Sequence, residues 1–172
     1  MVAKGKSGDR KKAKIIMSRN KLEAPAGFTL LRLSQPGSFI EINGPLFGKR
    51  EANRLVMGFR VEPRHCNPAN ICHGAMMLAL ADMLIGPGTE FEVQSGRFLP
   101  TVSITADFLA PAPLDAWVEG RAEPLRMTSG LLFAQCLITA DGNPALRASG
   151  IVKLGAPVSS VPGSPDIRGL VP

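Results

Sequence analysis

Apolar and polar residues alternate along several segments of the chain, and this period of two predicts β-strands. Residues 101–109 (TVSITADFL) show the pattern most clearly, with an apolar residue at every second position. The Asp141-Gly142 pair is typical of a two-residue hairpin turn between strands. Strand-like composition or spacing is also found at residues 38–42, 53–62, 116–124, 131–140 and 145–154.

One segment differs from these and predicts a long helix. Residues 72–86 are rich in Ala, Met and Leu and contain no proline, which favours helix. Gly86-Pro87-Gly88 should end it. The predicted order is therefore two strands, one helix and four strands. A single apolar helix ahead of antiparallel strands indicates an α+β domain whose sheet curls around the helix.

Charge is distributed unevenly and divides the chain into parts. The net charge is +6, yet residues 1–21 hold eight Lys or Arg and one Asp, so the remainder carries about −1. We expect residues 1–26 to be a basic, disordered tail and residues 27–154 to form one domain. Residues 155–172, rich in Pro, Gly and Ser, should be a second loose tail. Because the predicted domain is nearly neutral, no nucleic-acid partner is expected.

Cysteine usage and hydropathy indicate the compartment. Cys66, Cys72 and Cys136 form an odd set without a C-x-x-C motif, which does not suit a disulfide framework in a secreted protein. The N-terminus lacks the apolar region of a signal peptide. No apolar run reaches the roughly 18 to 20 residues that a membrane span needs. We therefore expect a cytoplasmic location and no membrane partner.

Asp82 is the most unusual residue of the predicted helix. Nothing polar occurs from Gly74 to Ala81, so a carboxylate here enters an apolar setting in which ionisation is disfavoured. An acid near a helix C-terminus also opposes the helix dipole, which makes a purely structural role a poor explanation. At about 100° per residue, Asp82 lies on a side of small residues. The opposite, bulky side should pack on the sheet and consists of Met76, Met77, Leu80, Met83 and Leu84.

His73 and Asp82 are too far apart to meet within one chain. Nine residues of helix correspond to about 13 Å of rise and half a turn. If the two side chains cooperate, one of them must come from a second copy. Two such helices side by side across a two-fold axis would pair each Asp82 with the His73 end of the other helix.

The spacing of these residues resembles the hotdog-fold acyl-CoA thioesterases of the phenylacetate-pathway type. The motif N-x5-H-G followed by an acid comprises Asn67, His73, Gly74 and Asp82, and TVSITADFLAPA is similar to the family's next strand. The resemblance covers residues 38–154. It implies a hotdog fold, in which one long central helix is wrapped by a curved antiparallel sheet. It also implies acyl-CoA hydrolysis without metal or cofactor in a homodimer or a dimer of dimers.

The resemblance also implies a role for each site residue. Asp82 would be general base or nucleophile, and the amide of Gly74 would polarise the thioester carbonyl. Asn67 would hold that carbonyl or the attacking water, His73 would support, and Thr101 would lie beside the acid. Independent physics agrees, because a helix N-terminus offers free N–H donors where an oxyanion develops. Desolvation also raises the pKa of a carboxylate toward the range in which it acts as a general base.

One position departs from the family, which usually has a second glycine where this chain has Ala75. The extra methyl group could narrow the acyl channel, so it puts substrate choice in doubt more than the reaction. The acyl group itself stays open. Three arginines are candidates for the CoA phosphates, and each is equally plausible as a solvated charge: Arg97, Arg126 and Arg147.

The same residues are compatible with other functions. His65, Cys66, Cys72 and His73 offer metal-ligand chemistry, but their spacing is looser than common zinc sites. A Cys72–His73 nucleophile pair is disfavoured because sequence neighbours seldom orient for proton transfer. Hydratases and dehydratases of hotdog-like fold, and a non-catalytic acyl-CoA sensor, remain alternatives.

Overall fold

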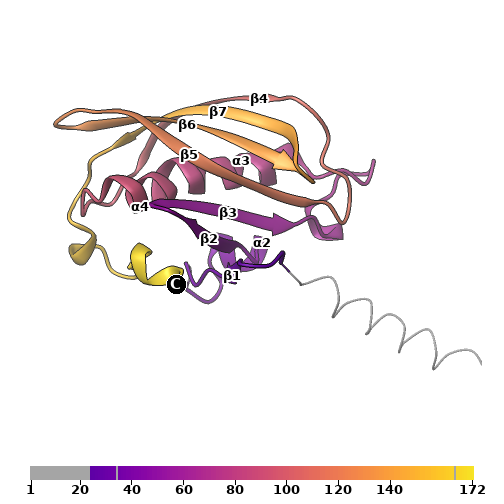
Figure 1. Ribbon diagram of the computed structural model, residues 1–172, viewed down its shortest axis with the longest axis horizontal. Coiled ribbons are helices and arrows are strands. Elements are labelled where there is room, and N and C mark those ends of the chain that lie inside the picture. Colours follow the sequence, from indigo (N-terminus) through magenta and orange to yellow (C-terminus); the bar gives the residue numbers. More distant parts are fainter. Residues whose placement is uncertain (1–23, 34, 165) are drawn as a thin grey trace, which may run out of the picture.

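A computed structural model describes residues 24–33, 35–164 and 166–172 (Figure 1). Most of the predicted basic tail lies outside these residues. The described chain is an α+β domain in which a curved, fully antiparallel sheet arches over one main helix, as predicted (Figure 1). The strand order is β1-β2-β3-β5-β6-β7-β4. The strands are β1 (Thr29–Leu30), β2 (Phe47–Glu51), β3 (Arg54–Arg60), β4 (Thr101–Phe108), β5 (Trp117–Met127), β6 (Leu131–Ala140) and β7 (Asn143–Lys153).

The helical elements lie between these strands and after the last one. The main helix α3 spans Gly74–Met83. A five-residue π-helical turn follows at Leu84–Gly88 and leads directly into α4 (Thr89–Val93). Short elements complete the fold: α2 (Phe39–Asn43) and 3-10 turns at Pro63–His65, Val158–Ser160 and Ile167–Leu170.

The hairpin between β6 and β7 is confirmed. Asp141 and Gly142 both have positive φ, 47° and 82°, as a two-residue turn that matches strand twist requires. Ala140 pairs with Asn143 across the turn. The five predicted strands from 53–62 to 145–154 are all present, with ends that shift by a few residues.

The predicted strand at residues 38–42 is wrong, because this segment forms helix α2. Its apolar run is too short for periodicity to separate a strand from a helical turn. The helical turn is closed by Asn43, whose side-chain amide donates to Phe39 O at 2.8 Å. The prediction lacked β2, the polar segment FGKRE, which pairs with β3 along its whole length.

The prediction that Gly86-Pro87-Gly88 ends the helical path is also wrong. Pro87 lacks an N–H and would clash in a regular helix, but the wider π-helical turn accommodates it. The Thr89 hydroxyl donates to the carbonyls of Ile85 and Gly86, the latter at 3.0 Å. The helical path therefore continues to Val93 and ends at Gln94, which is left-handed at φ 54°.

Most of the bulky side of α3 is buried in the core, as predicted. Met83 is the exception, because it is half-buried and lines a cavity. Leu84 and Ile85, in the turn after α3, are fully buried. Two glycines allow this close approach. A Cβ on Gly120 would lie 3.0 Å from Leu84 Cδ1, and one on Gly150 would lie 2.8 Å from Ile85 Cγ2.

The residues after β7 differ from the predicted loose tail where the structure describes them. They form two 3-10 turns. Val171, near the C-terminus, is only 4% exposed and belongs to the hydrophobic core. Within the described residues, no helix is both long and apolar enough to cross a membrane.

His65 joins α2 to the loop that precedes α3. The ring is 4% exposed; Nδ1 accepts the Glu62 N–H at 3.0 Å, and Nε2 lies 2.8 Å from Asn43 O. This arrangement fits the neutral ring with its proton on Nε2. Desolvation, as the largest cause, lowers the pKa of His65 below its usual value.

The lowered pKa of His65 predicts a loss of stability in acid. Below about pH 6.5 the unfolded chain takes up a proton that the folded chain resists, so the free energy of unfolding falls as the pH drops toward the folded pKa. Urea denaturation at several pH values should show this slope. A His65→Gln variant should show a shallower slope between about pH 6.5 and 5. Equal slopes in wild type and His65→Gln would contradict the assignment.

Candidate active site

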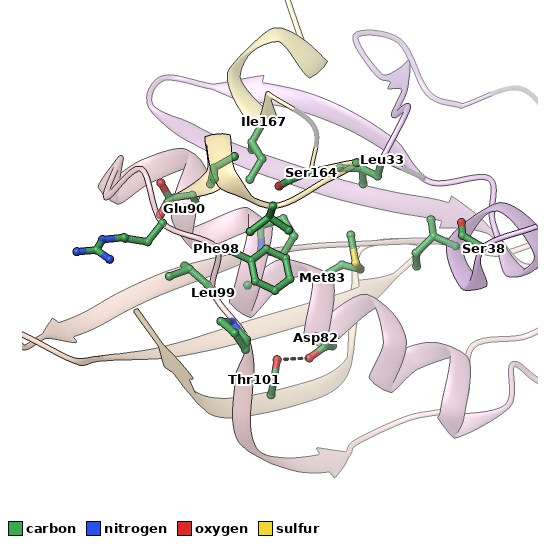
Figure 2. Close-up of a pocket in the computed structure, with 18 of the residues that line it drawn as sticks. Leu33, Ser38, Asp82, Met83, Glu90, Phe98, Leu99, Thr101, Ser164 and Ile167 are labelled. Atoms are coloured by element: carbon green, nitrogen blue, oxygen red, sulfur yellow. Dashed lines mark hydrogen bonds between the residues drawn. The ribbon is translucent and has the colours of Figure 1, made fainter. Parts of the chain in front are cut away.

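Asp82 and Thr101 form the one polar contact between α3 and the start of β4 that the described residues show (Figure 2). The Thr101 hydroxyl donates to Asp82 Oδ1 at 2.6 Å. Asp82 is in the last turn of α3 and half-buried, while Thr101 is the first residue of β4. The structure therefore brings together the acid and the hydroxyl that the sequence singled out. The hydroxyl satisfies one carboxylate oxygen and leaves the other available.

A cavity of about 600 Å³ opens beside this pair. Its floor is the end of α3 and the turn after it, including Met83, Gly86 and Pro87. Gly86 lies one helical turn beyond Asp82 on the same side. A Cβ there would meet only Leu99 O, at 3.6 Å. The absence of a side chain at this position thus keeps open the space next to the acid.

The start of α3 presents a free backbone donor. His73 caps the helix, because its Nδ1 accepts the Ala75 N–H at 3.1 Å and its carbonyl accepts the N–H groups of Met76 and Met77. The Gly74 N–H takes part in none of the hydrogen bonds found among the described residues. A Cβ on Gly74 would lie 3.0 Å from the Phe108 ring. The Gly74 amide is consequently a free donor at the positive end of a helix dipole.

Asn67 lies in the loop before this helix start. Its side-chain carbonyl accepts the Ala69 N–H at 2.9 Å, and its backbone N–H donates to Ile71 O. Asn67, His73 and Gly74 therefore gather before or at the first residue of α3, while Asp82 is at the other end. At about 1.5 Å per residue, the helix keeps the two groups more than 10 Å apart in one chain.

The three candidate phosphate-binding arginines lie in different places. Arg97 lines the Asp82 cavity and donates to Gly155 O at 2.9 Å. Arg147 forms an ion pair with Asp107 at 2.7 Å on an exposed surface, and Arg126 is exposed on β5. Only Arg97 of the three is next to the acid.

Glu90 is a cavity residue that sequence reasoning missed. It is 7% exposed, and its carboxylate accepts the Ser95 hydroxyl and the Gly96 N–H, the latter at 2.7 Å. Glu90 thereby fixes the loop that leads to β4. No sequence pattern indicates this role, because Gly86-Pro87-Gly88 predicts that the helical path ends before Glu90.

The metal and cysteine readings find no support. His65 has both ring nitrogens engaged, as described above. The Cys72 thiol donates to His73 O rather than to an imidazole nitrogen, and burial raises the pKa of Cys72 to about 12. Within the part of the chain that the structure describes, no three His, Cys, Asp or Glu residues are grouped as metal ligands.

The fold and the site define a hotdog protein with an acid at the end of its central helix. Comparison with known proteins supports the same fold class. Residues 69–145 match the family model of the Thioesterase superfamily, which confirms the resemblance inferred from the sequence motif. This match supports a hydrolase that acts on thioesters in general.

Individual relatives are more distant. A Pseudomonas aeruginosa protein, named as a candidate esterase, is 28% identical over 134 residues, which is 77% of this chain and 98% of that protein. Zebrafish thioesterase superfamily member 2 has a TM-score of 0.63 at 22% identity, covering 71% of this chain and 89% of that one. A hypothetical thioesterase from Streptococcus pneumoniae, whose structure contains coenzyme A, has a TM-score of 0.59 at 15% identity, covering 69% and 95%. These structural likenesses show the hotdog fold.

Burial of the cysteines predicts slow modification. At about pH 8, iodoacetamide should alkylate Cys72 and Cys136 of the native protein more slowly than Cys66, because alkylation requires the thiolate. Burial raises the pKa of Cys72 to about 12 and that of Cys136 to about 11, and Cys66 is only half-buried. Peptide mass spectrometry would give the order, and in denaturant all three should react alike. Fastest labelling of Cys72 would revive a nucleophilic role for it.

Proposed function

We propose that the protein hydrolyses an acyl-CoA thioester to a free acid and CoA in a site shared by two copies of the chain. The observation that carries this proposal is the separation of Asp82 from the free Gly74 N–H by the length of α3. A second copy, related by a two-fold axis, can place its Gly74 opposite this Asp82. The coenzyme A in the structure of the Streptococcus pneumoniae protein supports a CoA thioester as the substrate.

The chemistry follows from the two ends of the helix. Asp82, held by the Thr101 hydroxyl, accepts a proton from water as the water oxygen attacks the thioester carbonyl, or attacks that carbon itself. Negative charge develops on the carbonyl oxygen, and the Gly74 N–H of the second copy stabilises it. The C–S bond then breaks and the CoA thiolate leaves. If Asp82 acts as the base, the thiolate takes the proton that Asp82 removed from water. If Asp82 acts as the nucleophile, water then hydrolyses the aspartyl anhydride to the free acid and supplies the proton for the thiolate. Asn67 orients the carbonyl or the water, and His73 keeps the helix start in place.

The exposed side of the molecule supports a dimer. β4 is an edge strand of eight residues that pairs only with β7 among the described strands. Val102 and Phe108 on this strand are 60% and 58% exposed, and Leu78 on α3 is exposed beside them. An open edge with apolar side chains favours pairing with another chain. Asp82 and Gly74 both lie on elements that border this surface.

Removing the acid tests the reaction. Asp82→Asn should lower kcat/KM for acyl-CoA hydrolysis by about 100-fold or more, because the amide cannot act as base or nucleophile. Thr101→Ala should cost about tenfold, the effect of one charge-assisted hydrogen bond, and Thr101→Ser should recover most of it. Release of free CoA thiol gives the rates. The control Glu123→Gln, which removes an exposed carboxylate on β5, should leave the rate unchanged. Full activity of Asp82→Asn would rule out the proposed site.

Mixing two inactive variants tests whether the site is shared. Asp82→Asn and Asn67→Ala homodimers should each be nearly inactive. After the subunits are exchanged, statistical mixing makes half of the dimers mixed, and each mixed dimer has one intact site of two. Activity should therefore recover to about a quarter of the wild-type value. Each variant refolded alone is the control, and no recovery in a confirmed mixture would mean that the site lies within one chain.

A further inference from the structure

The residues after β7 form the wall of the cavity that faces Asp82. We call residues 155–164 and 166–171 the C-terminal strap. Figure 1 shows it in yellow, passing from the end of β7 beside α4 to the region of β1 and β2. In Figure 2, Ser164 and Ile167 of the strap lie on the opposite side of the cavity from Asp82 and Thr101, with Phe98 between them. The family-model match ends before the strap, at residue 145.

The start of the strap is fixed to the loop that leads to the site. Phe98 exchanges backbone hydrogen bonds with it, accepting from Gly155 N–H and donating to Ala156 O, both at 2.9 Å. Val158 N–H donates to Gly96 O at 2.9 Å. Thr101 follows this loop directly. The beginning of the strap is therefore held in a defined position relative to Asp82.

The far end of the strap is anchored in the core. Val171 is 4% exposed, and it packs where Gly48 of β2 leaves room, since a Cβ on Gly48 would lie 3.0 Å from Val171 Cγ1. The Asp166 carboxylate accepts the Arg168 N–H at 3.1 Å and caps the last 3-10 turn. With both ends held, the residues between them form a built wall of the cavity.

The cavity side of the strap is mainly apolar and carries no charge. Val158, Val161, Pro162 and Ile167 line the cavity, and Ser164 contributes the one polar side chain of the described strap residues that do so. The charged groups of the lining are elsewhere: besides Asp82 they are Glu90, which holds Ser95 and Gly96, and Arg97, which donates to Gly155 O. A charged end of an acyl group would meet the strap without a partner, and burying it there would be costly.

We propose that the C-terminal strap determines acyl selectivity, so that the cavity takes neutral, apolar acyl groups of medium length and Val161 limits how far they extend. This inference rests on the proposed hydrolysis of acyl-CoA. The acyl chain leaves the thioester at Asp82, crosses the space kept open at Gly86 and ends against the strap. Each added methylene that is buried in the apolar cavity strengthens binding until the acyl chain reaches the strap. Longer chains do not fit and are hydrolysed less efficiently.

A comparison of acyl-CoA substrates with strap variants tests this. Propionyl-, octanoyl-, octanedioyl- and palmitoyl-CoA are assayed with wild type, Val161→Phe and Val161→Ala. The wild type should prefer octanoyl- to both octanedioyl- and palmitoyl-CoA. Val161→Phe should lower kcat/KM for octanoyl-CoA about tenfold relative to propionyl-CoA, and Val161→Ala should raise the relative rate with palmitoyl-CoA. The matched controls are Ser159→Phe and Ser159→Ala, two residues away on an exposed side chain outside the lining.

The outcomes separate the two proposals. If the wild type hydrolyses these thioesters and both Val161 variants keep its chain-length profile, the proposed role of the strap is wrong. A preference of the wild type for octanedioyl-CoA would also contradict that role. A wild type that hydrolyses none of them would overturn the proposed function instead. In that case the role of the strap is tested by measuring the affinity for the non-hydrolysable thioether S-octyl-CoA by calorimetry. Weaker binding in Val161→Phe but not in Ser159→Phe supports it, and equal binding in both refutes it.

Discussion

The close packing of the central helical path against the sheet is the constraint on which the rest of the structure depends. Leu84 and Ile85 reach the sheet only because Gly120 and Gly150 carry no side chains. Apolar burial of this kind is the main stabilising term in a domain of this size. It also fixes the rotation of α3, because the bulky side must face the strands. Asp82 is thereby directed toward Thr101 at the start of the edge strand β4.

That rotation explains why one helix can serve both halves of the proposed reaction. An acid at the end of α3 and a free amide at its start are chemically complementary, yet the rigid helix prevents them from reacting on one substrate within one chain. The exposed apolar edge at β4 gives a physical reason for two chains to associate beside both groups. Association and chemistry then depend on the same surface.

Sequence reasoning predicted the features that are encoded locally. The α+β architecture, α3 and the strands from β3 onward follow from periodicity, and the Asp82–Thr101 pair follows from the resemblance to the thioesterase family. Periodicity failed at α2, because a segment of five residues with three apolar ones fits a strand or a helical turn equally well. It also failed at β2, which has few apolar residues and becomes a strand by pairing with β3. The cavity walls could not be predicted, because Glu90 and the strap are brought to Asp82 by tertiary packing.

The π-helical turn at Leu84–Gly88 has a consequence for how this region can evolve. A π-turn holds one more residue than an α-helical turn at the same point. Deleting that residue would rotate everything beyond it by about 100°, which would turn Phe91 out of the core and Glu90 away from its loop. Homologous chains should therefore keep the number of residues between Gly74 and Val93 constant. Gains and losses of residues should instead accumulate in the exposed turns between strands.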